Sequence, residues 1–128
     1  MLLAVNGTLM RGLELNGNLL DSGGKFVREA RTAPVYRLYS IGDVHPAMLR
    51  AESGGAAIAL EIWELPAAGL ARVLAGEPAG LCIGKVALND GGEVLGVLGE
   101  PWLIARGAEI TRHGGWRAYI AVAKDTRK

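Results

Sequence analysis

The pattern of short apolar segments separated by glycine turns constrains the fold of this chain more than any other sequence feature. Glycine accounts for 19 of the 128 residues and half of the chain is hydrophobic. No apolar run approaches the roughly 20 residues that a bilayer span needs. Glycines and Asn-Gly pairs make tight turns because they adopt backbone angles that other residues avoid. With no linker, repeat or low-complexity tract, residues 1–128 are expected to form a single α+β domain, a small mixed β-barrel flanked by short helices.

Residue propensity and spacing predict the elements in order. Residues 35–41 and 56–65 are rich in β-branched and aromatic residues and too short for typical helices, so we expect strands. The run Asn-Asp-Gly-Gly at 89–92 predicts a hairpin between strands over 81–88 and 93–100. Further expectations are a helix over 66–76, a helix of one or two turns between loops within 13–33, and a strand or short helix within 109–124.

The end of the first apolar segment bears on function. Residues 1–5 are typical of a strand, which runs straight into Asn6, Gly7 and Thr8. A hairpin turn is one interpretation, since Asn-Gly pairs mostly connect strands. The other is a loop whose backbone N–H groups face a ligand, with glycine allowing close approach. These residues alone favour the turn and leave the second interpretation open.

Charge and cysteine content exclude several classes of function. The formal net charge is +1, with acids and bases interspersed, which gives no basic footprint for nucleic acid and no polybasic patch for a membrane. Cys82 is the one cysteine, so no internal disulfide can form, and we expect it to be a small core residue. The chain start has no basic region before its short apolar run, which predicts a cytoplasmic protein.

The common catalytic and metal-binding signatures are mostly missing. SGGKF lacks the upstream glycine and the hydroxyl of a phosphate-binding loop, and AESGG lacks the first glycine of a nucleophile elbow. His45 and His113 lie far apart in the sequence, and there is no spaced cluster of histidines and cysteines. We therefore expect no metal and no other cofactor.

Two carboxylates stand out by their positions. Glu61 interrupts an apolar strand, so it either faces solvent on an edge, which is the commoner outcome, or points into a cavity. Glu77 lies at the expected helix end between Gly76 and Pro78, where a carboxylate opposes the helix dipole. A solvated helix end is the commoner outcome here too. In an apolar pocket the same carboxylate would have a raised pKa and could act as an acid or a base.

Several segments taken together resemble the C-terminal domain of allophanate hydrolase over most of the chain. They are VNGTLMRG, TAPVYRLYSI, GGAAIALEIWELPAAGLARVL, EPAGLCIGKVAL and EITRHGGWRAYIA. The resemblance implies a γ-glutamylcyclotransferase-like fold in which the loop after the first strand floors a cavity. It also implies that the Ser/Ser/Lys amidase domain of the full-length enzymes has no counterpart here. We thus expect a stand-alone domain that does not cleave the allophanate amide.

The same resemblance implies roles for individual residues. In γ-glutamylcyclotransferases the loop reads Tyr-Gly-Ser or Tyr-Gly-Thr before an apolar residue, and its N–H groups hold the substrate's carboxylate. Gly7, Thr8 and Leu9 match that pattern, while Asn6 replaces the tyrosine. The catalytic glutamate of those enzymes follows a helix, as Glu77 does here, which makes Glu77 a candidate general base.

The closing segment GGWRAY adds residues to the candidate binding set. Arg117 carries a planar charged fork suited to a small carboxylate, and Trp116 and Tyr119 could wall the pocket. The alternative is a core tryptophan and an arginine in a surface ion pair. Glu61 is the last residue of the candidate binding set, because a carboxylate inside an apolar strand is expected if its side chain points into a binding cavity.

Three hypotheses for function follow. The first is a domain that binds a small carboxylate or dicarboxylate above residues 6–9, in urea or allophanate nitrogen metabolism, where the family is proposed to process the N-carboxylated product. The second is a γ-glutamylcyclotransferase-type enzyme that releases 5-oxoproline with Glu77 as general base. The third is a non-catalytic module that forms a homodimer or assembles with a separate amidase.

Overall fold

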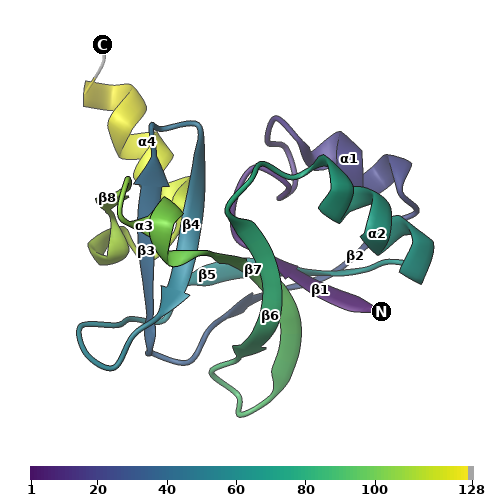
Figure 1. Ribbon diagram of the computed structural model, residues 1–128, viewed down its shortest axis with the longest axis horizontal. Coiled ribbons are helices and arrows are strands. Elements are labelled where there is room, and N and C mark those ends of the chain that lie inside the picture. Colours follow the sequence, from purple (N-terminus) through teal and green to yellow (C-terminus); the bar gives the residue numbers. More distant parts are fainter. Residues whose placement is uncertain (127–128) are drawn as a thin grey trace.

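The computed structural model describes residues 1–126, and their strands form two sheets (Figure 1). The larger sheet has the order β2-β5-β1-β7-β6 and the smaller one β4-β3-β8. β1 lies at the centre of the larger sheet, antiparallel to β5 and parallel to β7. The strands are β1 (Leu2–Val5), β2 (Lys25–Arg31), β3 (Tyr36–Ile41), β4 (His45–Arg50), β5 (Ala59–Glu64), β6 (Leu81–Ala87), β7 (Glu93–Gly99) and β8 (Ala108–Glu109).

The helices gather on two sides of the molecule. α1 and α2 lie together on one side of the larger sheet, and α3 and α4 lie beside β3 and β4 on the other (Figure 1). α2 begins after Pro66 and buries Leu70 and Val73, which are spaced to share one helix face. The helices are α1 (Asn16–Asp21), α2 (Ala67–Gly76), α3 (Pro101–Ile104), the 3₁₀ turn η1 (Thr111–His113) and α4 (Trp116–Thr126).

The larger sheet curls until its two outer strands approach each other at one end. Thr32 and Leu88, which directly follow β2 and β6, form an isolated antiparallel bridge. On either side of it, the Ala33 N–H donates to the Ala87 carbonyl at 2.9 Å and the Asn89 N–H donates to the Arg31 carbonyl at 3.0 Å. No ladder joins β2 to β6 in the described part of the chain, so the sheet is strongly curved without being a closed barrel.

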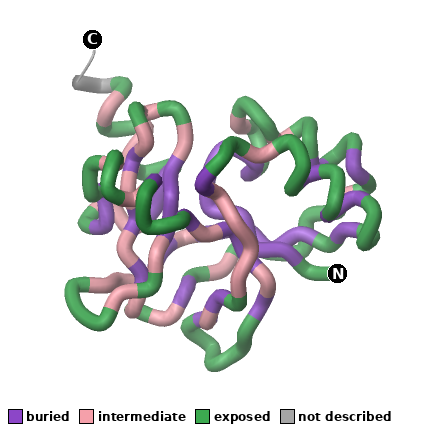
Figure 2. The backbone as a smooth tube through the Cα atoms, in the orientation of Figure 1, coloured by how far each residue is buried: buried purple, intermediate pink, exposed green. Residues whose placement is uncertain are grey.

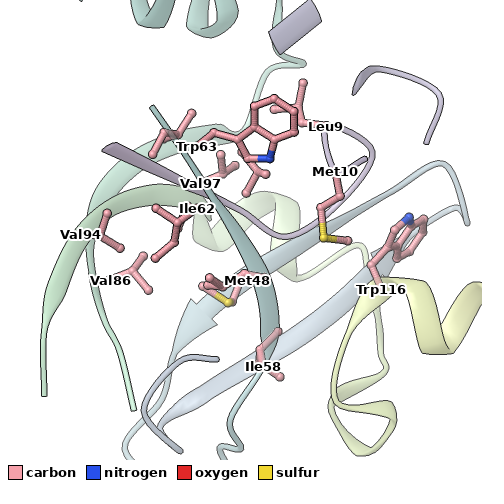
Figure 3. Close-up of a cluster of buried hydrophobic side chains, with 14 of the residues drawn as sticks. Leu9, Met10, Met48, Ile58, Ile62, Trp63, Val86, Val94, Val97 and Trp116 are labelled. Carbon is pink, nitrogen blue, oxygen red and sulfur yellow. The ribbon is translucent and has the colours of Figure 1, made fainter. Parts of the chain in front are cut away.

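The core lies between the curled sheet and the smaller sheet. Buried residues follow β1, β3, β5 and β7, whereas the hairpin tips and helix surfaces are exposed (Figure 2). Ile62, Trp63 and Val97 pack in this cluster with Met48 from the smaller sheet (Figure 3). Each fully buried side chain of this size contributes about 1.5–3 kcal/mol to folding, so the cluster fixes how the two sheets pack.

Most of the expected elements are confirmed. The α+β class, the helix that ends at Gly76 and the hairpin at residues 89–92 are as predicted, and the closing segment is the helix α4. The strands β2, β4 and β8 and the short helix α3 were not predicted. The short helix expected within residues 13–33 is α1, but β2 follows it where a loop was expected; β2 is an edge strand whose residues are nearly all exposed, so it lacks the usual alternation. β4 contains Pro46, which an edge strand tolerates.

Candidate functional site

Two separate hollows hold the candidate residues. We call the first the loop depression; it has a volume of about 300 Å³ and is lined by Thr8, Glu14, Leu15, Asp43, Val44, His45, Glu77 and Pro78. We call the second the α4 cleft; it has a volume of about 770 Å³ and is lined by parts of β2 and β5 and by the start of α4. Glu61 and Arg117 line the α4 cleft and do not line the loop depression. The structure therefore divides the predicted site residues into two groups.

Residues 6–9, which we call loop 6–9, are held in place by contacts with β7 and β4. The Asn6 side chain is buried, and its amide donates to the Val97 carbonyl at 3.0 Å. Gly7 lies against Pro46 so closely that a Cβ at position 7 would be 2.5 Å from the proline Cδ. Because β1 pairs with β5 and β7 rather than with the segment that follows it, Asn-Gly here belongs to a loop and not to a hairpin turn. The interpretation that the residues alone favoured is thus wrong.

The carbonyls and the N–H groups of loop 6–9 differ in how they are hydrogen-bonded. Its carbonyls are used: the Leu15 N–H donates to the Thr8 carbonyl at 2.9 Å and the Asn16 amide donates to the Leu9 carbonyl at 2.8 Å. Across residues 1–126, no acceptor is found for the N–H groups of Gly7, Thr8 and Leu9. The space directly beside the loop is only about 20 Å³. That is room for about one water, so the body of any ligand would lie in the adjoining loop depression.

Glu77 faces the same hollow as loop 6–9. It is the residue at which α2 ends, with extended backbone (φ −75°, ψ 150°), and its side chain is half-buried. Burial raises the pKa of the Glu77 carboxyl above its ordinary value, and the nearby charge of His45 only partly opposes this. Glu77 and His45 line both the loop depression and the small space beside the loop. The structure thus brings Glu77 and loop 6–9 together, and it gives the carboxyl the environment of an acid–base group.

Tyr119 braces the wall of the loop depression rather than lining it. Its hydroxyl donates to Asp43 Oδ1 at 2.7 Å, and the Ser40 hydroxyl donates to the same oxygen at 2.6 Å. Asp43 lies in the turn between β3 and β4 with a left-handed backbone (φ 59°). Tyr119 also packs against Trp116, with ring centroids 5.8 Å apart. It therefore connects α4 to the hollow that Asp43 lines.

Glu61 is buried and lines the α4 cleft, so of the two alternatives the commoner one, a carboxylate facing solvent, is wrong. Its Oε1 accepts the Arg11 backbone N–H at 2.9 Å and the Trp63 indole N–H at 3.1 Å. Its Oε2 accepts Arg11 Nε at 3.1 Å and Arg117 Nη2 at 3.3 Å. Burial alone would raise the pKa of this carboxyl, but the Arg11 and Trp63 donors outweigh burial and hold the pKa below its ordinary value. Glu61 is consequently an ionised anchor for two arginines.

Arg117 belongs to that anchor and to the α4 cleft. Its Nη2 also donates to the Arg11 carbonyl at 3.0 Å, and about half of its side chain is exposed. Arg117 was expected to contact a ligand bound at loop 6–9. It lies instead in the lining of the α4 cleft, away from the space beside that loop. The tryptophan beside it, Trp116, is buried at the start of α4, as the core alternative supposed.

Several residues at the two hollows were not predicted from the sequence. His45 and Asp43 line the loop depression, and Arg11 is the main partner of Glu61. A signal for the first two exists: Gly42 precedes Asp43 between two short strands, a pair suited to the left-handed angles (φ 60° and 59°) of this hairpin turn. No local signal marks Arg11, because the Glu61 with which it pairs is remote in sequence.

Two properties of the described chain bear on the classes of function considered above. Within residues 1–126, no three histidine, cysteine, aspartate or glutamate side chains are placed to hold a metal ion together. None of the described helices has the length and apolar character that crossing a membrane requires.

Comparisons with known proteins give a consistent result. The family model described as the allophanate hydrolase C-terminal domain matches residues 1–121. The urea amidolyase of Saccharomyces cerevisiae is 30% identical over 95% of this chain, which spans 7% of that protein's length. A solved structure of a uropathogenic E. coli-specific protein is 59% identical with a TM-score of 0.92, covering 94% of both chains. Kluyveromyces lactis allophanate hydrolase is 29% identical with a TM-score of 0.90, over 95% of this chain and 21% of that one.

A more distant likeness concerns the fold alone. An AIG2-like protein of Mus musculus shares 20% identity and a TM-score of 0.61 over 77% of this chain and 75% of its own. This supports the expected γ-glutamylcyclotransferase-like fold class.

Proposed function

Because the chain belongs to the allophanate hydrolase C-terminal domain family, we propose that it acts in urea and allophanate nitrogen metabolism on a small N-carboxylated acid. In this proposal the carboxylate of the acid is held by the N–H groups of Gly7, Thr8 and Leu9. The rest of the molecule occupies the loop depression, where Glu77 faces its nitrogen.

The proposal is supported mainly by one observation: the unbonded N–H groups of loop 6–9 and the Glu77 carboxyl, whose pKa is raised, line the same space. Three consecutive N–H groups without acceptors suit an anion, because backbone donors recognise charge without a side chain. The hollow above them is otherwise acidic, with Glu14, Asp43 and Glu77 in its lining. An N-carboxylated acid suits both parts, since it offers a carboxylate at one end for the loop and an N–H donor in the middle for the acidic lining.

The proposed chemistry is decarboxylation by proton transfer. The Glu77 carboxylic acid gives its proton to the nitrogen of the N-carboxylated acid as the nitrogen–carbon bond breaks. The bonding electrons stay on nitrogen, carbon dioxide leaves, and Glu77 becomes a carboxylate that water reprotonates. A raised pKa favours this role because it keeps the acid form populated at higher pH. Activity is then lost as the pH rises through the pKa of Glu77.

The test combines binding and turnover. Malonate, a stable small dicarboxylate, is titrated into ¹⁵N-labelled protein, and the amide signals of Thr8 and Leu9 are expected to shift in a saturable way. Carbon dioxide release is then followed with the N-carboxylated acid generated in situ by an allophanate amidase. Glu77→Gln is expected to lower the rate by about 100-fold or more. Glu14→Gln, the same charge change in the same hollow, serves as the control.

The outcomes decide as follows. Equal rates for the wild type and Glu77→Gln, or an equal loss in Glu14→Gln, would overturn the assignment of Glu77. A malonate titration that leaves the amides of residues 7–9 unmoved would overturn the carboxylate site.

The second candidate function is a γ-glutamylcyclotransferase-type reaction, favoured by the same convergence of Glu77 and loop 6–9 on one hollow. Here Glu77 acts in its ionised form and takes a proton from the substrate's α-amine, which attacks the γ-amide. The reaction forms 5-oxoproline and expels the amine. Release of 5-oxoproline from γ-glutamyl amines, lost in Glu77→Gln, would favour this candidate, and no release from the wild type would remove it.

The third candidate is assembly with an amidase. In the Kluyveromyces lactis relative the matched segment makes up 21% of a longer chain. A partnership in trans would appear as co-elution of the purified protein with an allophanate amidase on a sizing column. Independent elution, with unchanged amidase activity, would count against it.

A further inference from the structure

The start of α4 leaves hydrogen-bond donors open to the α4 cleft. α4 runs over Trp116–Thr126 and carries no acidic residue in its first turn. No acceptor within residues 1–126 is found for the N–H groups of Gly115, Trp116, Arg117 and Ala118. These residues line the cleft, so the positive end of the helix dipole faces its interior.

A second observation comes from the Trp116 side chain. This residue is only 2% exposed, and its indole N–H donates to no acceptor within the described chain. No polar side-chain atom that is fully sealed from solvent lacks a partner in the described residues, so the small exposed part of Trp116 includes this N–H. Trp116 lies at the margin of the buried cluster, at the start of α4 (Figure 3), and it lines the α4 cleft. The indole therefore offers an unused donor to an occupant of the cleft.

Arginines add positive charge at the same place. Arg117 uses its Nη2 for Glu61 and the Arg11 carbonyl, which holds the guanidinium and leaves its other nitrogens available. Arg31 reaches over the helix start, with its Nη1 3.8 Å from where a Cβ on Gly114 would lie. The cleft lining holds three arginines and two glutamates, which is one positive charge in excess. A single negative charge would balance it.

Apart from Asn89 and His113, the remainder of the cleft lining carries no polar side chain, and the cleft is roomy. Ala30, Ala59, Ala118 and Ala121 line it, and none of them carries a side-chain donor or acceptor. The volume of about 770 Å³ is in the range of pockets for small organic molecules and is far larger than a bare carboxylate needs.

We propose that the α4 cleft is a binding site for an organic monocarboxylate with an apolar body. The carboxylate lies between the N–H groups at the start of α4, the Trp116 indole N–H and the guanidinium groups of Arg31 and Arg117. The apolar body lies on the alanine side chains. This site is separate from loop 6–9 and does not depend on the function proposed for that loop.

The test uses 4-phenylbutyrate as the probe and nuclear magnetic resonance of the ¹⁵N-labelled full chain. Trp116→Phe assigns one of the three tryptophan indole signals. The probe is expected to shift the Trp116 indole N–H and the amides of residues 115–118 in a saturable way. The uncharged analogue 4-phenylbutanol is expected to bind at least about tenfold more weakly, because a charge-assisted hydrogen bond is lost.

Matched variants separate this site from a general attraction of anions. Arg117→Gln is expected to weaken binding about tenfold. Arg112→Gln, an equal charge change on an exposed residue outside the cleft lining, is expected to leave binding unchanged. Since Arg117 also contacts Glu61, Arg31→Gln serves as a second variant that leaves that contact intact, with weakening expected again.

Three results would overturn the proposal: no saturable shift at residues 115–118, equal binding of the alcohol, or equal weakening by Arg112→Gln. Malonate shifts at residues 7–9 test only the other hollow, so each proposal can fail without the other.

Discussion

Replacing Glu61 with glutamine tests the anchor that holds Arg11 and Arg117 on the sheet. The substituted side chain would keep its shape and one carbonyl oxygen, which can still accept the Arg11 N–H and the Trp63 indole N–H. Its amide group, however, would face Arg11 Nε and Arg117 Nη2 donor to donor. The Glu61→Gln change therefore removes two ion pairs and places an unpaired donor in a buried position.

The size of the expected destabilisation follows from how exposed the side chains of Arg11 and Arg117 are. Breaking a fully buried ion pair costs about 3–5 kcal/mol, whereas an exposed pair contributes about 0–1 kcal/mol. Here the carboxylate is 4% exposed, while the side chains of Arg11 and Arg117 are 44% and 53% exposed and can be rehydrated. We therefore expect Glu61→Gln to lower the free energy of unfolding by about 2 kcal/mol, between these limits.

A matched control is available on the same arginine. Glu29 accepts from Arg11 Nη2 at 2.8 Å, but its side chain is 76% exposed. Glu29→Gln is expected to change the free energy of unfolding by less than about 0.5 kcal/mol. Urea unfolding followed by circular dichroism at pH 7 measures both variants.

The pH dependence gives a second check. Because the pKa of Glu61 is lowered in the folded state, its contribution to stability is fully present above the pKa of the unfolded chain, about 4.3. The contribution is lost as the pH falls through the lower folded-state pKa. The stability difference between wild type and Glu61→Gln should therefore shrink below about pH 4. Equal effects of the two glutamate substitutions at pH 7, or a difference that grows on acidification, would refute the reasoning.

Other positions give further expectations. Thr32→Val should cost about 1–3 kcal/mol in urea unfolding, since it leaves the buried Ile58 N–H without the Thr32 hydroxyl that accepts it at 2.9 Å. Gly80→Ala should cost at least about 2 kcal/mol more than Gly91→Ala: both glycines have positive φ (94° and 90°), but only at position 80 would the new Cβ lie within 3 Å of neighbouring side chains. A smaller difference in the free energy of unfolding would show that the α3 side chains move aside to accommodate the new Cβ, against the expectation. Burial, with the charge of Glu100, raises the pKa of the Cys82 thiol, so its reaction with a disulfide reagent at pH 8 should be slower than that of a free thiol in the unfolded chain. Equal rates would contradict the stated burial.

Resemblance to a family accounts for part of what could be predicted of the site. Loop 6–9 and Glu77 were expected to meet, and they line one hollow. Their roles in catalysis and binding remain predictions, as do those of Arg117 and Tyr119. The residues beside them in the hollow, His45 and Asp43, come from a hairpin that the sequence reasoning did not identify.

What the sequence determined by itself was local. The hairpin at residues 89–92 and the helix that ends at Gly76 depend on backbone angles and on spacing within a few residues, and such preferences can be read from the chain directly. β2 could not be read in this way, because an exposed edge strand is held by the ladder of its neighbour β5 rather than by its own pattern.

The tertiary structure alone decided where the charged groups went. Glu61 is 50 residues from Arg11 and 56 from Arg117 along the chain, and only the pairing of β5 with β1 and the docking of α4 bring the three together. A carboxylate within an apolar strand is compatible with solvent or with a buried pair, and its free energy depends on donors from distant segments. For the same reason the candidate residues separated into two hollows: residue type is a local property, whereas proximity is set by packing.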